Sequence, residues 1–161
     1  MRNRRGQTVE RFVAYPRTLC FIRNGDDVLL LKGAAGKRLY ANLYNGVGGH
    51  VERDEDVLAS LRREVREETG LEIADPVLRA VIVADEGNGP GVLIFVYIAT
   101  AASRLVRSSS EGELVWVPLA RVLDYDLVPD LRQLLPLLFC GPADTLLYGH
   151  YAAGRYDIHA S

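Results

Sequence analysis

The chain has 161 residues, of which 48% are hydrophobic and 25% charged, and its formal net charge at pH 7 is -2. This length and composition predict a single domain over residues 1–161, with a hydrophobic core large enough to be stable without disulfides or a structural metal. The near balance of charge argues against bulk nucleic acid as a partner, because proteins that bind it usually present a strongly basic surface. No apolar run approaches the roughly 18 residues of a membrane span, so we expect no membrane partner.

The N-terminus and the cysteines indicate a cytoplasmic protein. The chain begins MRNRRGQTVE, which is polar and unlike a secretory signal, and we expect residues 1–12 to form a flexible arm. Cys20 and Cys140 each lie in or beside an apolar run, so we expect inert core residues rather than a disulfide. Such thiols suit a reducing compartment.

The first predicted elements are two strands and a broken third. TLCFIR at 18–23 and VLLLK at 28–32 flank Asn24-Gly25, which predicts a β-hairpin. NGVGGHVE at 45–52 predicts a strand interrupted by glycines, which permit a close approach of the backbone at its end.

The loop between these segments, at 33–44, is rich in small and basic residues. Lys32, Lys37 and Arg38 are candidates to contact phosphate groups. They are equally compatible with exposed side chains that hold no ligand.

Residues 55–69 predict an amphipathic helix. Asp54 and Glu55 suit its N-terminus, and Gly70 suits the left-handed residue after its last turn. At about 100° per residue the apolar side chains form one stripe, which we expect to pack on the sheet. The members of this stripe are Val57, Leu58, Leu61 and Val65.

Three acids of this helix, Glu64, Glu67 and Glu68, lie together along one edge of the apolar stripe. Like charges at this spacing repel by a few tenths of a kcal/mol per pair, roughly, so the arrangement is unfavourable without a cation. Hard divalent cations with oxygen ligands, Mg²⁺ above all, fit such a cluster.

The second half of the chain predicts further strands and one more main helix. The predicted elements are strands at 77–84 and 92–99 around a turn at 86–91, a loop at 108–113, a strand at 114–117, a helical turn at 119–123, a helix at 130–139 and a hairpin at 145–158 around Gly154. Strands flanked by two main helices predict an α/β fold, with a mixed sheet between helices in an α/β/α sandwich.

One stretch resembles a known family at each defining position. Gly49, Glu55 and the run REVREETGL at 63–71 have the residues and spacing of the signature box of the Nudix hydrolases. A chance match at a given position has a probability of about 10⁻⁹. The resemblance implies an enzyme that uses Mg²⁺, with Mn²⁺ able to replace it, to cleave a pyrophosphate bond in a nucleoside diphosphate joined to a further group X. Its partner is then a small-molecule nucleotide.

The resemblance also implies roles for individual residues. Glu64, Glu67 and Glu68 hold the metal, and Arg63 and Glu55 support and orient them. The Gly48 carbonyl is the likelier of two glycine carbonyls at 48–49 to bind the metal. Outside the box, Glu111 lies five residues before Trp116 and resembles an acidic loop that supplies one more carboxylate, with Glu113 as the alternative.

For the substrate, residues 17–158 are most similar to the MutT-like branch of that family. YNGVGG at 44–49 and VPD at 128–130 carry this likeness, which implies that Asn45 and Asp130 face the base. Asp130 is equally suited to cap a helix. Tyr44 is a candidate pocket wall or a core residue, and His50 a phosphate contact or a structural residue. The branch has tryptophan and a second aspartate where this chain has Val128 and Leu131.

The sequence therefore predicts a Mg²⁺-dependent hydrolase that converts a (deoxy)nucleoside triphosphate to the monophosphate and pyrophosphate. Oxidised purine nucleotides such as 8-oxo-dGTP are included, as in nucleotide pool sanitation by an 8-oxo-dGTP diphosphatase. The alternatives are a pyrophosphatase for ADP-ribose, a dinucleotide or a nucleotide sugar, and a catalytically silent module that senses a nucleotide. A monomer and a homodimer both fit the sequence.

Overall fold

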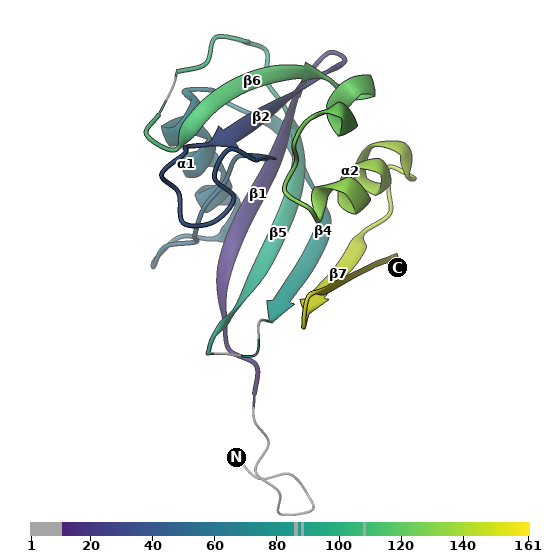
Figure 1. Cartoon of the computed structure of the whole chain (residues 1–161). Coiled ribbons are helices and arrows are strands. Elements are labelled where there is room, and N and C mark those ends of the chain that lie inside the picture. The colour runs from purple at the N-terminus through teal and green to yellow at the C-terminus, as the bar shows by residue number, and fades with distance from the viewer. Residues whose placement is uncertain (1–10, 86, 88, 108) are drawn as a thin grey trace, which may run out of the picture.

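A computed structural model describes residues 11–85, 87, 89–107 and 109–161, and in it one mixed β-sheet lies between two helices (Figure 1). The strands are β1 Ala14–Asn24, β2 Asp27–Gly33, β3 Tyr44–Asn45, β4 Ala74–Asp85, β5 Gly91–Thr100, β6 Gly112–Pro118, β7 Leu147–Ala152 and β8 Arg155–Ala160. The helices are α1 Val57–Thr69, α2 Leu131–Cys140 and the short 3-10 helix η1 Leu119–Asp124. The predicted α/β fold is confirmed.

The eight strands form one sheet in the order β3-β2-β1-β5-β4-β7-β8, and β6 pairs with β2. β1 runs parallel to β5, and β4 runs parallel to β7. The other pairs are antiparallel. The first hairpin, the β4–β5 pair and the C-terminal hairpin therefore form where the sequence predicts them, with strands a few residues longer.

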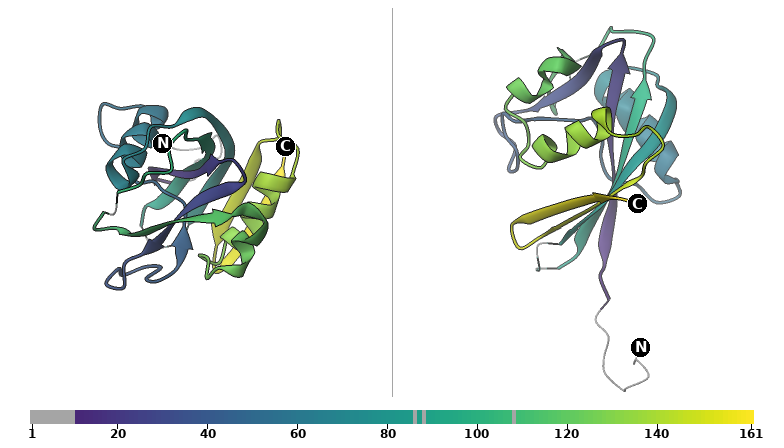
Figure 2. Two further views of the ribbon diagram at one scale, coloured as in Figure 1. Left: turned by 90° about the horizontal axis from the view of Figure 1, so that it is seen from above. Right: turned by 90° about the vertical axis from the view of Figure 1, so that its right-hand side faces the viewer.

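Successive side chains of β1 point to opposite faces of the sheet, and each face meets one helix. Cys20 and Ile22 belong to the core under α1, to which the helix contributes Leu61 and Val65. Phe21, between them, belongs to the core under α2. The leucines of that second core are Leu131, Leu134, Leu135 and Leu138. Figure 2 shows the two helices on opposite sides of the sheet.

The segment after β3 lies beside β1, which brings the start of α1 to the middle of the sheet. The backbone N–H of Cys20 donates to Val47 O at 2.7 Å, and that of Thr18 donates to Gly49 O at 2.8 Å. Gly48 has a positive φ of 155°, and a Cβ there would overlap the carbonyl of Thr18. Only glycine fits this approach, so the predicted strand at 45–52 is reduced to β3 and isolated bridges at Val47 and His50.

Helix α1 begins two residues later than the sequence predicts. Asp54 has a positive φ of 66°, so it lies in the turn before the helix. Asp56 is extended and its carboxylate accepts from Leu58 N at 2.8 Å and Ala59 N at 2.9 Å, which makes it the N-cap. Leu58, expected in the buried stripe, is 40% exposed.

The two cysteines differ in burial. Cys20 is buried as predicted, and burial raises the pKa of its thiol to about 12, but Cys140 is exposed because it ends α2.

Most of the predicted arm, residues 1–10, lies outside the described residues, whereas the ring of Phe12 packs on Gly91. Among the described residues, the helices lack the combined length and apolar character of a membrane span.

Replacement of Asp56 by alanine should lower the free energy of unfolding by about 1 kcal/mol, because two N–H groups of the first turn lose their acceptor. Urea unfolding followed by circular dichroism measures this loss. The control is Asp144→Ala, which alters an exposed aspartate outside the helices and strands. Equal midpoints for the two variants would contradict the capping role.

Candidate active site

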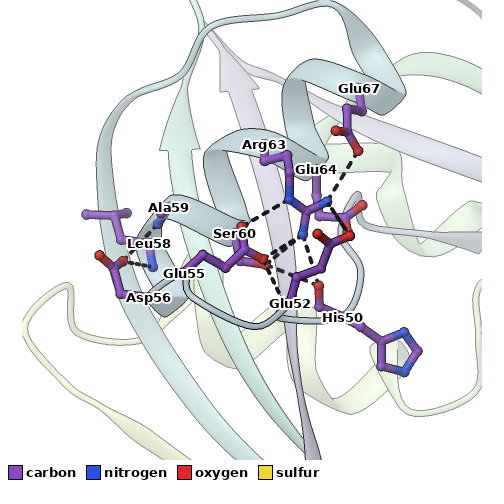
Figure 3. Close-up of polar contacts among 10 residues, drawn as sticks. All are labelled: His50, Glu52, Glu55, Asp56, Leu58, Ala59, Ser60, Arg63, Glu64 and Glu67. Carbon is purple, nitrogen blue, oxygen red and sulfur yellow. Dashed lines mark hydrogen bonds and ion pairs between the residues drawn. The ribbon is translucent and has the colours of Figure 1, made fainter.

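Arg63 lies at the centre of a cluster of carboxylates at the start of α1 (Figure 3). Its Nε donates to Glu55 at 3.0 Å and its Nη2 donates to the same carboxylate at 2.7 Å. Its Nη1 donates to Glu64 at 2.9 Å and to Glu67 at 3.3 Å. The hydrogen bond from Arg63, with one from the Glu52 backbone N–H, lowers the pKa of Glu55 to about 2. The predicted orienting residues therefore fix the acidic edge of the helix.

Glu64 lies against the backbone at Gly49. A Cβ added to Gly49 would overlap the Glu64 carboxyl group, with Oε2 only 2.6 Å away. The side chain of Glu64 is 16% exposed. The glycine at this position therefore leaves the space that the carboxylate occupies.

Glu68 is the most deeply buried acid of the cluster, with 9% of its surface exposed. One of its oxygens accepts from the Gly48 backbone N–H at 3.1 Å. Burial, with a smaller contribution from the nearby charges of Glu64 and Glu111, raises the pKa of Glu68 to about 7 against the lowering effects of the Gly48 hydrogen bond and of Lys37. The protein thus holds a buried carboxylate among like charges, a position that a cation would stabilise.

The residues fit a divalent cation by the chemistry of their donors. Carboxylate oxygens around a buried, negatively charged position are the ligands that hard divalent ions prefer. In the described part of the chain, no three acidic, histidine or cysteine side chains already converge on one point. The reason is that basic side chains hold them: Arg63 pairs with Glu64 and Glu67, and Lys37 pairs with Glu111 at 2.5 Å.

A cavity of about 680 Å³ opens beside Glu68. It is bounded by β1, the loop at 33–44, the C-terminal end of α1, β4, β5, α2 and the C-terminal hairpin. The predicted site residues that line it are Asn45, Gly48, Glu68, Glu111 and Asp130. Five residues from four separate segments of the sequence are thus brought to one pocket.

Asn45 and Asp130 present different polar groups to this cavity. The side-chain oxygen of Asn45 accepts from the Gly46 N–H at 2.8 Å, so its NH₂ group is the one that can donate to a ligand. Asp130 occupies the N-cap position of α2, as the alternative role as a helix cap predicts, but its carboxylate makes no capping hydrogen bond there. Burial raises the pKa of Asp130. Val128 and Leu131, which stand where the MutT-like branch has a tryptophan and a second aspartate, form apolar lining.

Three predicted substrate contacts do not line the cavity. Lys32 lies 5.7 Å from the centroid of the Tyr44 ring, and Tyr44 packs edge to face on Tyr125 at 5.2 Å. His50 contributes its backbone carbonyl, which accepts from Arg63 Nη2 at 3.1 Å, while its exposed imidazole points away from the cluster (Figure 3). Burial and the charge of Arg17 lower the pKa of this imidazole.

Sequence reasoning missed several lining residues. Of the three basic residues considered for phosphate contact, Lys37 and Arg38 line the cavity and Lys32 does not. The missed residues are Arg17, Thr18, Tyr151 and Tyr156. The two tyrosines carry no motif, and only the pairing of their hairpin with β4 brings them here. Glu113, the alternative to Glu111, is exposed on β6 opposite Lys32.

A sheet between two helices, with an acidic helix edge facing a glycine segment, is the architecture of a phosphate-processing hydrolase of the Nudix type. A family model described as NUDIX domain matches residues 15–138, and the chain belongs to this family. It is a MutT-like Nudix hydrolase.

Relatives and solved structures agree with this assignment. The chain is 28% identical over 139 residues to an uncharacterized Nudix hydrolase, YvcI, of Bacillus subtilis, covering 83% of this chain and 84% of that protein. It is 31% identical over 101 residues to human 8-oxo-dGDP phosphatase NUDT18, covering 63% of this chain and 29% of that protein. The crystal structure of a MutT protein from Bacillus halodurans superimposes with a TM-score of 0.74 and 26% identity, over 89% of this chain and 97% of that one.

The raised pKa of Glu68 predicts a pH dependence of stability in the metal-free protein. A carboxyl group whose pKa is about 7 in the folded state and 4.5 ordinarily stabilises the fold while it is protonated. This contribution is complete below pH 4.5 and is lost as the pH rises to about 7. The total is at most roughly 3 kcal/mol.

Wild type in EDTA should therefore lose stability relative to Glu68→Gln between pH 4.5 and 7. Thermal unfolding at half-unit pH steps measures the difference. Glu113→Gln, a change at an exposed acid on β6, serves as the control and should run parallel to wild type. Parallel curves for Glu68→Gln as well would show that Glu68 is not strained by burial.

Proposed function

We propose that this protein is a Mg²⁺-dependent pyrophosphohydrolase that converts a nucleoside triphosphate to the monophosphate and pyrophosphate. The observation that carries the proposal is Glu68, a buried carboxylate without an ion pair in the described structure. It lies beside Gly48 at the wall of a cavity of about 680 Å³. A cation bound at Glu68 would therefore lie beside space for a nucleotide.

Nudix hydrolases generally use a divalent metal, and the donors here favour Mg²⁺ with Mn²⁺ as a substitute. The ligands are the carboxylates of the helix edge, the acidic loop and the backbone at 48: Glu64, Glu67, Glu68, Glu111 and the Gly48 carbonyl. When bound, the metal neutralises negative charge on the phosphate oxygens. The ion pairs of Arg63 and Lys37 hold their partner carboxylates at the edge of this site.

One part of the cavity carries basic side chains, and another part carries the groups that would bind the base of a nucleotide. Lys37, Arg38 and Arg17 supply positive charge for phosphates. Asn45 and Asp130 supply a donor and an acceptor for the base, which discriminate bases more strongly than apolar contacts do. Oxidised purines such as 8-oxo-dGTP are the first substrates to test, together with 8-oxo-dGDP, because a relative is an 8-oxo-dGDP phosphatase.

The complete set of acids distinguishes this function from that of a nucleotide sensor. Binding alone does not require Glu67, which is 60% exposed and reaches the cluster only through Arg63. A pyrophosphatase for ADP-ribose, a dinucleotide or a nucleotide sugar would use the same acids. Only a substrate panel separates those activities from triphosphate hydrolysis.

Glu68→Gln and Glu67→Gln should each lower Mg²⁺-dependent turnover by at least about 10²-fold, because each removes one charge from a preorganised site. The assay measures pyrophosphate and phosphate released from normal and oxidised triphosphates, 8-oxo-dGDP, ADP-ribose, a dinucleotide and a nucleotide sugar. EDTA should abolish the activity of wild type.

The matched control is Glu72→Gln. Glu72 is an exposed acid just beyond α1 that pairs with Arg66 at 2.6 Å, away from the cavity. Its removal should leave turnover unchanged. Full Mg²⁺-dependent turnover in both Glu68→Gln and Glu67→Gln would contradict the assignment of these residues as metal ligands. No turnover of any substrate, together with thermal stabilisation by a nucleotide, would instead support the sensor.

A further inference from the structure

The C-terminal hairpin of β7 and β8 lies outside the family match, which ends at residue 138, yet it forms one wall of the cavity. β7 extends the sheet by parallel pairing with β4, where Tyr151 lies opposite Ala84. Ala84 and Tyr151 both line the cavity. The hairpin therefore adds to the pocket a surface from outside the matched residues 15–138.

The turn of the hairpin fixes which side chains face the cavity. Ala153 and Gly154 both have positive φ, 50° and 75°, the combination of a two-residue turn that sets the register of the strands. In this register Tyr151 lies opposite Tyr156, so both rings project from one face of the hairpin. Both line the cavity. Tyr148 belongs to the other face, where it stacks on His159.

The hydroxyl of Tyr156 is buried and, among the described residues, has no hydrogen-bond partner. The ring is held in place by packing: a Cβ on Gly149 would lie 3.3 Å from its Cε2 atom, and the ring belongs to the core under α2. A buried hydroxyl without a partner costs about 1 to 3 kcal/mol. Phenylalanine would fill the same space without that cost, so packing alone does not account for the hydroxyl.

Asn45 presents a second polar group to the same cavity. Its side-chain oxygen accepts from the Gly46 N–H, which leaves the NH₂ group to donate to a ligand. A donor from Asn45 and the hydroxyl of Tyr156 together indicate a ligand with several polar atoms.

The residues around Tyr156 indicate which part of a nucleotide would lie next to its hydroxyl. Burial and the charge of Asp130 raise the pKa of Tyr156, so its hydroxyl stays protonated and can donate a hydrogen bond. Apolar residues surround the tyrosine side of the cavity: Ile82, Val128, Leu131 and Leu134. A flat heterocycle with acceptor atoms on its edge suits these walls, whereas a phosphate suits the basic residues Arg17, Lys37 and Arg38.

We propose that the β7–β8 hairpin forms the outer wall of a base-binding subsite and that Tyr156 Oη donates a hydrogen bond to an acceptor on the nucleobase. Tyr151, opposite it, supplies an aromatic surface in a cavity where Val128 offers none. This subsite rests on the proposed function, since it takes the base of the nucleotide whose phosphates that function cleaves. Tyr156 is in this account a specificity-determining residue.

The test compares Tyr156→Phe with Tyr148→Phe, a loss of the same hydroxyl on the opposite face of the hairpin. Calorimetry measures Kd for dGMP, dAMP, dCMP and dTMP, and for 2-deoxyribose 5-phosphate, which lacks a base. Kinetics on the matching triphosphates separate KM from kcat, and thermal unfolding reports stability.

Tyr156→Phe should weaken binding of the preferred monophosphate about 3- to 15-fold, the scale of one neutral hydrogen bond. KM should rise by a similar factor with kcat unchanged, binding of 2-deoxyribose 5-phosphate should be unaffected, and the midpoint of unfolding should stay equal or rise. Tyr148→Phe should match wild type throughout.

Three outcomes would overturn the subsite. They are unchanged base affinity in Tyr156→Phe, an equal loss for the base-free sugar phosphate, and no binding of any monophosphate by wild type. The failure of the proposed function is distinguishable, because it appears as absent turnover in wild type. If wild type binds a monophosphate without turnover and Tyr156→Phe weakens that binding, the subsite stands and the hydrolase function falls.

Discussion

The site depends on how closely the acidic edge of α1 approaches the glycine segment beside β1. Glu64 occupies the space that a side chain at Gly49 would fill, and Glu68 accepts from the Gly48 N–H. The first contact requires a residue without a Cβ atom at position 49, and both contacts remove carboxylates from water. The resulting excess of buried negative charge is unfavourable by itself, so the same packing that builds the core creates the demand for a cation.

Basic side chains of the protein itself neutralise part of this negative charge. Arg63 connects Glu55, Glu64 and Glu67, and Lys37 reaches Glu111 from the loop at 33–44. These ion pairs are adjustable, because guanidinium and ammonium groups can release a carboxylate oxygen when a stronger cation arrives. Glu68, which accepts a hydrogen bond from the Gly48 N–H and forms no ion pair among the described residues, is the acid for which a metal brings the largest change. The two basic residues thus keep the cluster folded without filling its centre.

Local patterns predicted the elements well and the cavity only in part. The period of the apolar residues and the turn signals located both hairpins and both main helices, since these depend on neighbours in the chain. Family spacing identified Glu68, Gly48 and Asn45, which do line the pocket. It overestimated His50 and Tyr44, whose side chains point or pack elsewhere, because a motif specifies position along the chain and not side-chain direction. Tyr156 was missed because it arrives through the non-local pairing of β7 with β4.

The central place of β1 has a consequence for how the chain is made. β1 lies between β2, its immediate successor, and β5, whose residues Gly91–Thr100 are its parallel partners. During synthesis on the ribosome, its N-terminal half must therefore wait for β5 before either the core under α1 or the core under α2 can close around it. Closing so long a loop slows folding and leaves apolar strand edges open meanwhile. The core under α2 stays open longer still, because its leucines at 131–138 are made after β5.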